Sequence, residues 1–175
     1  LTSTFSRSQS ASLEQARNGS FSSPVNPPSW VNGNAGASNS HYVEGFSIPY
    51  RMTCTGLSAG KHTLVIEYDN RSNNAAAIDF ITHYQRLLPH AQFGHVAETV
   101  DPLLGSGLTS PSINTFPIPA PVNNITVYGV PQPQTQFNII PASERLMTMY
   151  NGTSIDSIKY ITNGSVTGNS SSTQV

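Results

Sequence analysis

The sequence predicts an all-β fold, an antiparallel β-sandwich or jelly roll with a long loop excursion rich in proline and glycine. Short runs of alternating apolar and polar residues recur along the chain, and turn-forming dipeptides such as Asn151-Gly152 and Asn163-Gly164 separate several of them. No stretch keeps a helical period beyond two turns. About eight to ten short strands with frequent turns are typical of sandwiches and jelly rolls.

The first forty residues are rich in Ser, Asn, Gly and Pro and hold few large hydrophobic side chains. We predict a strand near Thr2–Ser10 and a short helical or irregular turn at Leu13–Arg17. A loop is expected to follow, because proline cannot donate to a β-ladder and three prolines lie close together: Pro24, Pro27 and Pro28.

The clearest alternation lies in the middle of the chain. Phe46–Leu57 and Lys61–Asp69 both alternate, and Gly56–Gly60 between them carries turn residues, which predicts an antiparallel hairpin. Asp69–Asn74 is predicted to be a further turn, and Ala76–Arg86 a third strand.

Residues 87–121 are predicted to be the long loop excursion, since prolines and glycines interrupt them throughout. Strands are expected to resume at Asn124–Val130, Thr135–Ile140, Glu144–Tyr150, Thr153–Thr162 and Ser165–Val175. The chain is interpreted as one sandwich domain over residues 1–175, with residues 1–20 as a candidate exchanged or extended N-terminal strand.

The amino-acid composition excludes several classes of binding partner. Charged residues make up 10% of the 175 residues and the formal net charge is −1, so we expect neither nucleic-acid binding nor a membrane-surface patch. No run approaches the roughly 20 apolar residues of a membrane span, so we expect no membrane insertion. A start at Leu1 suits a mature protein after removal of a signal peptide, and it also suits a fragment of a longer chain. Cys54 is the sole cysteine, and its place in an alternating run predicts a buried small hydrophobe.

Asparagine sequons suggest a glycoprotein. Asn followed at the second position by Ser or Thr is the acceptor pattern for N-linked sugar, and most of these sites fall in predicted turns. Turn chemistry of asparagine is the alternative explanation. The candidates are Asn18, Asn70, Asn124, Asn151, Asn163 and Asn169.

The sequence holds no catalytic or metal-binding motif. His83, His90 and His95 span a proline and match no standard zinc spacing, and His41 and His62 lie elsewhere. Carboxylates such as Glu44 and Asp101 are scattered singly, and nucleophile-elbow, P-loop and Rossmann patterns are missing. A run of oxygen-bearing side chains favours a turn over a calcium site: Asp69, Asn70, Asn73, Asn74 and Asp79. We expect no enzyme activity, no metal and no cofactor.

Three segments carry a resemblance: residues 30–51, residues 55–69 and residues 77–86. They resemble a β-sandwich module of large secreted and cell-surface proteins of prokaryotes, described as a prealbumin-like surface region. The resemblance implies an extracellular location and a structural or adhesive role, with no catalytic residues. In that family a further strand follows the segment that matches Thr162–Val175.

The leading hypothesis is a subunit of an extracellular filament or surface layer that assembles by exchanging edge strands with its own copies. The N-terminal segment would donate the strand through Thr4, Phe5, Ser6 and Arg7. The alternative is a carbohydrate-binding or adhesive surface module that contacts glycans through exposed aromatic side chains, for which Trp30, Tyr42 and Tyr128 are candidates; core packing of these rings is the competing explanation.

Overall fold

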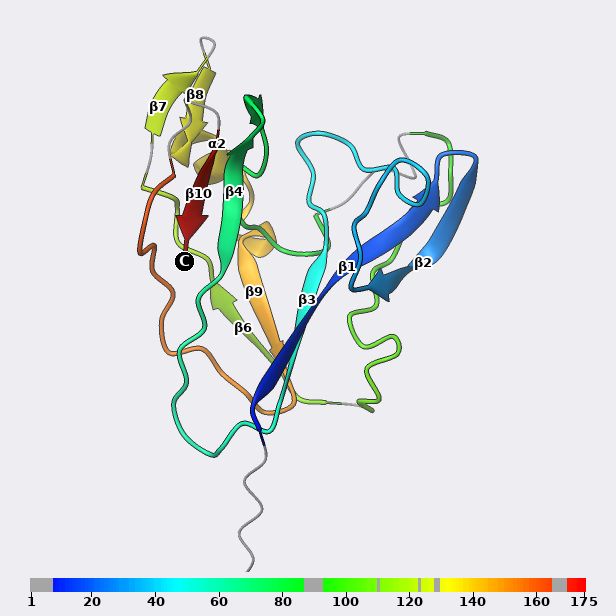
Figure 1. Ribbon diagram of the computed structural model, residues 1–175, viewed down its shortest axis with the longest axis vertical. Helices are drawn as coiled ribbons and strands as arrows, with labels where there is room; N and C mark the ends of the chain where they lie inside the picture. The colour runs from blue at the N-terminus through cyan, green and yellow to red at the C-terminus, as the bar shows by residue number, and fades with distance from the viewer. Residues whose placement is uncertain (1–7, 87–92, 110, 123, 128–129, 165–169) are drawn as a thin grey trace, which may run out of the picture. The chain divides into compact units, whose positions relative to one another are not determined.

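The computed structural model describes residues 8–86, 93–109, 111–122, 124–127, 130–164 and 170–175 (Figure 1). The chain divides into two compact units, Leu1–His62 with Tyr84–Thr109 and Thr63–His83 with Ser110–Val175. Regular structure in both is almost entirely antiparallel β-sheet. The all-β prediction is therefore confirmed.

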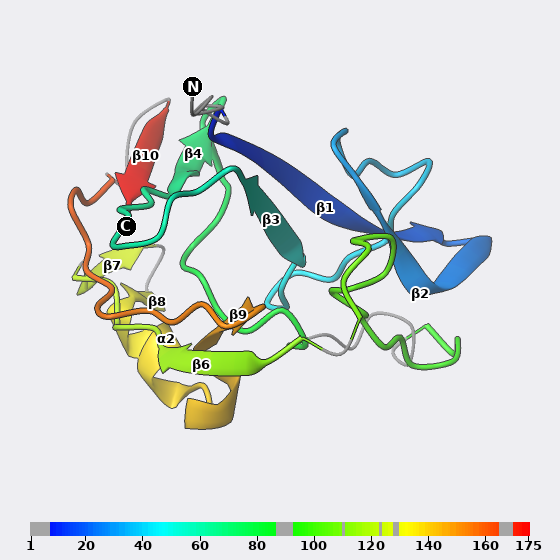
Figure 2. The same cartoon turned by 90° about the horizontal axis from the view of Figure 1, so that it is seen from below.

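The first unit is built on a three-stranded antiparallel sheet. β1 (Ser10–Ser20) lies between β2 (Ser23–Val31) and β3 (Tyr50–Thr55), as Figures 1 and 2 show. The β1–β2 hairpin turns at Phe21 and Ser22, and Gly19 just before the turn has a φ of +83°. A Cβ at Gly19 would lie 2.3 Å from the Ser23 carbonyl oxygen, so the hairpin requires glycine at this position.

Two expectations for the N-terminal region are wrong. Leu13–Arg17 was expected to form a helical turn and instead belongs to β1, and the proline-rich stretch expected to be a loop forms β2. β2 tolerates proline because it is the edge strand of its sheet. Its register with β1 also shifts between Arg17 and Gly19, so part of the strand does not follow a regular ladder. The expected strand at Thr2–Ser10 lies mostly outside the described residues.

The predicted central hairpin is also wrong. β3 covers only part of Phe46–Leu57 and pairs with β1, with Ser10 opposite Thr55 and Gln15 opposite Tyr50. Residues 61–66 form no strand. Gly56 is needed for a close approach instead, because its φ is +69° and a Cβ there would lie 2.5 Å from the Ser8 carbonyl oxygen. Gly56 was therefore correctly singled out as a glycine with a structural role, but its role is the contact with Ser8, which is distant in sequence, and not a hairpin turn.

The second unit contains three small antiparallel sheets. β4 (Glu67–Ser72) lies between β10 (Ser171–Gln174) and the two-residue β5 (Ala75–Ala76). The other two sheets each have two strands. They pair β6 (Ile113–Pro117) with β9 (Leu146–Tyr150), and β7 (Asn124–Val127) with β8 (Val130–Pro133).

Only two residues of the turn predicted at Asp69–Asn74 form a turn, because the others belong to β4. Asn73 and Asn74 have φ of 51° and 66°, the left-handed values of a tight turn between β4 and β5. The strand predicted at Ala76–Arg86 is almost absent, since no strand follows Ala76 in that segment. β6 lies within residues 87–121, where a continuous loop was expected.

Some of the strands predicted for the C-terminal region are present and others are not. Glu144–Tyr150 is confirmed as β9, and Asn124–Val130 covers β7 and the start of β8. Thr153–Thr162 forms no strand; Thr162 only makes an isolated bridge to Gln174. Within Ser165–Val175, β10 is the strand among the described residues.

Thr135–Ile140 is helical instead of extended. The helix α2 (Gln134–Ile139) buries Phe137, and Pro133 and Ile140 on either side are also buried, at the i, i+4, i+7 spacing of one helix face. Phe137 is 1% exposed, lies edge-on to Phe80 with ring centroids 5.4 Å apart, and has the Arg145 guanidinium 5.4 Å above its ring. A 3-10 turn, η1 (Ala142–Glu144), leads from α2 to β9. This cluster anchors the core of the second unit.

Candidate functional site

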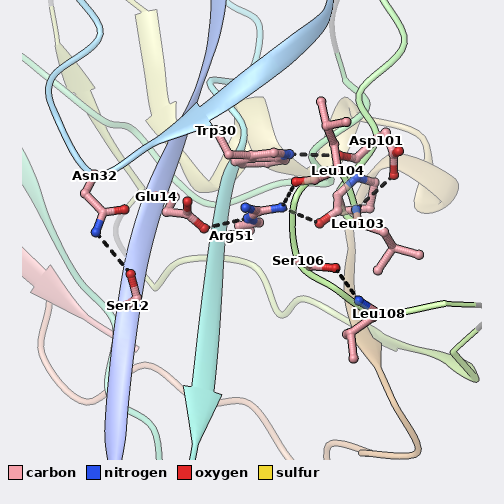
Figure 3. Close-up of polar contacts among 11 residues, drawn as sticks. Ser12, Glu14, Trp30, Asn32, Arg51, Asp101, Leu103, Leu104, Ser106 and Leu108 are labelled. Atoms are coloured by element: carbon pink, nitrogen blue, oxygen red, sulfur yellow. Dashed lines mark hydrogen bonds and ion pairs between the residues drawn. The ribbon is translucent and has the colours of Figure 1, made fainter.

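Arg51 holds a loop against the sheet of the first unit (Figure 3). Its Nε lies 2.6 Å from Glu14 Oε2, and both side chains are less than one-fifth exposed. Its Nη1 donates to the carbonyl oxygens of Pro102 and Leu104, at 3.0 and 2.7 Å. The guanidinium also lies 4.8 Å from the centroid of the Trp30 ring. Arg51, Glu14 and Trp30 therefore form a loop clamp.

Trp30 closes the same clamp from β2. Its indole Nε1 donates to the carbonyl oxygen of Asp101 at 2.8 Å, and the Asp101 carboxylate accepts from the Leu103 backbone N–H at 2.9 Å. Upstream, the Asn26 side chain bonds to the backbone of Ala97 and Thr99. Segment 97–104 is thus fastened to side chains of β2 and β3.

Asn18 is the buried polar centre of the first unit. It is fully buried, and its Oδ1 accepts from the His41 backbone N–H at 2.9 Å. Its Nδ2 donates to the His41 carbonyl at 3.2 Å and to Glu98 Oε2 at 3.4 Å. A glycan on Asn18 would require this amide to leave its buried position, so the folded unit offers no room for one.

Four rings gather next to Asn18 and form a hairpin-tip cluster: Phe21, His41, Phe93 and His95. His41 Nδ1 lies 2.7 Å from the Gly19 carbonyl, so Nδ1 carries the hydrogen. Phe21, in the β1–β2 turn, lies 5.1 Å from Phe93 and 5.5 Å from His95, centroid to centroid. Phe21 is 57% exposed and Phe93 40%. Phe21 and Phe93 therefore give the cluster an aromatic surface in contact with solvent.

The outer edge of β3 has no backbone partner among the residues that the structure describes. The Ala16 N–H donates to the Pro49 carbonyl. Hydrogen-bonded and non-hydrogen-bonded pairs alternate in an antiparallel sheet, so every second residue of β3 after Pro49 is hydrogen-bonded to β1. The N–H and C=O groups of Tyr50, Met52 and Cys54 therefore point away from β1. These groups form an open edge, and Cys54, expected to be buried, is exposed on it.

Tyr42 packs under the sheet and does not offer a free face. Its hydroxyl donates to the Ala16 carbonyl oxygen at 2.6 Å. Burial, with the negative charge of Glu98 nearby, raises the pKa of Tyr42 well above its usual range, so the hydroxyl stays a donor. Trp30 and Tyr42 thus both make hydrogen bonds that stabilise the fold. The third aromatic candidate, Tyr128, lies outside the described residues.

In the second unit, Thr173 of β10 links three segments. Its hydroxyl donates to Asn70 Oδ1 at 2.6 Å and accepts from the Gly164 backbone N–H at 2.8 Å. The Asn70 amide nitrogen donates to the Ile78 carbonyl at 3.2 Å. Val175 and Ile66 exchange two backbone hydrogen bonds of 2.9 Å. Residues 171–175 are therefore paired within their own unit.

The remaining sequence candidates are scattered. Among the sequons, Asn151 and Asn163 are exposed, Asn70 is half-buried, Asn124 starts β7, and Asn169 lies outside the described residues, as do Thr4, Phe5, Ser6 and Arg7. Burial lowers the pKa of His83, which lies 3.4 Å from Thr148 Oγ1. Within the described ranges, no three His, Cys, Asp or Glu side chains converge to hold a metal ion. Nor does any described helix have the length and apolar character needed to cross a bilayer.

Comparison with known proteins finds no matching family model, no matching curated protein and no matching solved structure. The loop clamp and the hairpin-tip cluster were not predicted from the sequence, since each joins residues that are distant along the chain. The open edge was not predicted because it depends on which strand pairs with β3. Their geometry supplies the grounds for a functional proposal.

We expect Asn18→Ala to lower the free energy of unfolding of the first unit by about 2–3 kcal/mol, because it leaves the buried backbone groups of His41 without their partner. Urea denaturation followed by fluorescence of Trp30, the only tryptophan, measures this change. Asn34→Ala, at an exposed asparagine of the same unit, should stay within about 0.5 kcal/mol of the parent. Equal effects of both variants would contradict the role of Asn18.

We expect Arg51→Lys to release the loop at residues 101–104, because an ammonium group cannot reproduce the guanidinium fork. Hydrogen exchange of the Leu103 and Leu104 amides should accelerate by about tenfold, as for a loss of roughly 1.4 kcal/mol of local stability. Arg17→Lys on β1, where the structure shows no ion pair among its described residues, is the matched control. Unchanged exchange in Arg51→Lys would show that the clamp does not hold the loop.

Proposed function

We propose that this chain is a structural subunit of an extracellular filament or cell-surface layer, assembled by β-strand exchange between copies. The observation that supports it best is the open edge of β3, where the backbone groups of Tyr50, Met52 and Cys54 have no backbone partner in the part of the chain that the structure describes. Natural sheets protect such edges with proline, charge or a covering segment, because an open edge pairs readily with another strand. The three residues include no proline and no charged side chain.

Exposed apolar side chains support the same proposal. In the described part of the first unit, Leu13 is 59% exposed, Ile48 40%, Tyr50 41% and Leu57 45%. All four lie on or next to β1 and β3, whereas Ala16 and Val100 are the buried hydrophobic residues of this unit. Exposed apolar surface around the open edge favours association of the protein over a monomer in solution.

Other parts of the proposal come from the sequence. The low charge, the sequons and the resemblance to prokaryotic surface modules favour an extracellular location, with Asn151 and Asn163 as the exposed candidates for glycans. A β-sandwich or jelly roll, with a loop excursion rich in proline and glycine that β6 interrupts, remains our proposal for the architecture. Nothing in this proposal requires catalysis, a metal or a cofactor.

The donor in this proposal is the segment of residues 1–7, which includes Thr4, Phe5, Ser6 and Arg7. β1 begins at Ser10 and is the central strand of its sheet, so a deletion that tests the donor must stop at Arg7.

We expect deletion of residues 1–7 to abolish assembly while the folded units persist. Thr4→Pro should weaken assembly, because proline interrupts strand pairing, and Thr4→Val, which keeps β propensity, should not. Analytical ultracentrifugation and electron microscopy measure the assembly, and circular dichroism checks the fold. Normal polymers from the deletion variant, or no polymers from the parent, would refute the proposal.

A carbohydrate-binding or adhesive surface module is the second candidate function. The observation that favours it is the hairpin-tip cluster, where Phe21 and Phe93 are exposed beside two imidazoles. Aromatic faces pack on the apolar faces of sugar rings. The cluster is a better platform than Trp30 or Tyr42, whose rings serve the fold.

If the second function holds, a glycan array probed with the parent protein should give specific signals that Phe21→Ala removes by about tenfold or more, for a loss of roughly 1.4 kcal/mol of binding free energy. Leu13→Ala, at a residue of similar exposure on β1, should leave them unchanged. An array without signals for the parent protein would exclude this function for the glycans displayed.

A further inference from the structure

We infer that the outer edge of β3 is the acceptor of the exchanged strand, and that the seven residues Leu1–Arg7 of a second copy of this chain occupy it. The inference rests on the proposed strand exchange and goes further by naming the acceptor edge and its occupant. It follows from the direction of backbone groups in the first unit and from what covers its other edge.

The β2 edge of the same sheet is unsuited to an incoming strand. β2 contains Pro24, Pro27 and Pro28, which have no backbone N–H, so its outer edge cannot offer a regular row of donors. Its length is also fastened to segment 97–101 through the side chains of Asn26 and Trp30. An incoming strand would have to displace these contacts.

The β3 edge has neither obstacle. Tyr50–Thr55 is a continuous six-residue strand without proline or glycine. Since Glu14 and Arg51, Ser12 and Thr53, and Ser10 and Thr55 are the pairs bonded to β1, the intervening residues of β3 turn both backbone groups outward. The incoming strand would find donors and acceptors at Tyr50, Met52 and Cys54 in regular alternation.

The segment Leu1–Arg7 suits this edge in composition. A strand that covers the six residues of β3 needs about six extended residues, or about 20 Å, and the segment supplies them. The segment has no proline or glycine, and Thr2, Thr4 and Phe5 favour strands. Main-chain hydrogen bonds supply the affinity in such pairing, so a polar segment is sufficient.

A second copy is the better donor than the chain's own segment. Ser8 and Gln9 already lie against Gly56 on the β1 side of β3, with the Ser8 carbonyl where a Gly56 side chain would be. The chain's own residues 1–7 would have to cross the end of β3 to reach its outer edge. A segment from another copy approaches that edge directly, and repetition of this contact generates a head-to-tail polymer.

Cys54 permits a direct test, because it is the sole cysteine and is exposed on this edge. The parent is mixed with Thr4→Cys/Cys54→Ser, which carries a size tag, and treated with a short thiol-to-thiol cross-linker. We expect heterodimers to exceed both homodimers. In a strand, side chains alternate between the two faces, so moving the new cysteine stepwise from residue 2 to residue 6 should give cross-linking with a period of two.

Each outcome of the cross-linking experiment decides one point. Heterodimers with a period of two support the acceptor edge and its donor. In a separate variant that carries Thr4→Cys and keeps Cys54, cross-links that form only within single chains refute the second copy as the donor. Polymers that require residues 1–7 but give no cross-link to Cys54 refute β3 as the acceptor and leave the proposed function intact, whereas the absence of polymers refutes the proposed function itself.

Proline substitutions give an independent readout. Cys54→Pro removes an outward N–H and no bond to β1, so the protein should fold and fail to assemble. Thr53→Pro removes a bond to Ser12 and should instead destabilise the sheet. Normal assembly of folded Cys54→Pro would overturn the inference.

Discussion

The first unit depends on the alternation of backbone hydrogen bonds along β1. Even-numbered residues from Ser10 to Ala16 bond to β3 and its extension at Pro49, while Gln15 and Arg17 lie opposite β2 residues. One strand therefore fixes the register of both neighbours, and it also fixes which backbone groups of β3 point away from β1. The open edge follows directly from this parity, and the loop clamp then uses the side chains that the same register brings together.

Buried polar groups complete that arrangement. Asn18 satisfies both backbone groups of His41, and Arg51 satisfies two carbonyl oxygens of the loop at residues 101–104. The described core of this unit is small, so these polar contacts specify positions that apolar packing alone would leave loose. The hairpin-tip cluster is held in the same way, through the bond between His41 and the Gly19 carbonyl.

The sequence predicted the β class, the turn at Asn73–Asn74 and the strand β9, because local alternation and asparagine turns carry that information. It did not predict the pairing of β3 with β1, since alternation in Phe46–Leu57 does not say which strand is the neighbour. The prolines of β2 were misleading because an edge position removes their cost. In α2, the spacing of Pro133, Phe137 and Ile140 carried a helical signal that the short alternating run obscured. Cys54 was expected to be buried because the open side of β3 could not be foreseen.

The pairing of β10 with β4 has a consequence for biosynthesis. Gln174 bonds to Glu67 across 107 positions of the chain, and Thr173 bonds to Asn70 across 103. On the ribosome, β4 emerges about a hundred residues before the strand that completes its sheet, and contacts of such long sequence separation close late. During that interval the nascent chain presents an unfinished β4 to its surroundings. A chaperone that keeps the polypeptide unfolded until its synthesis is complete would spare it this vulnerable stage.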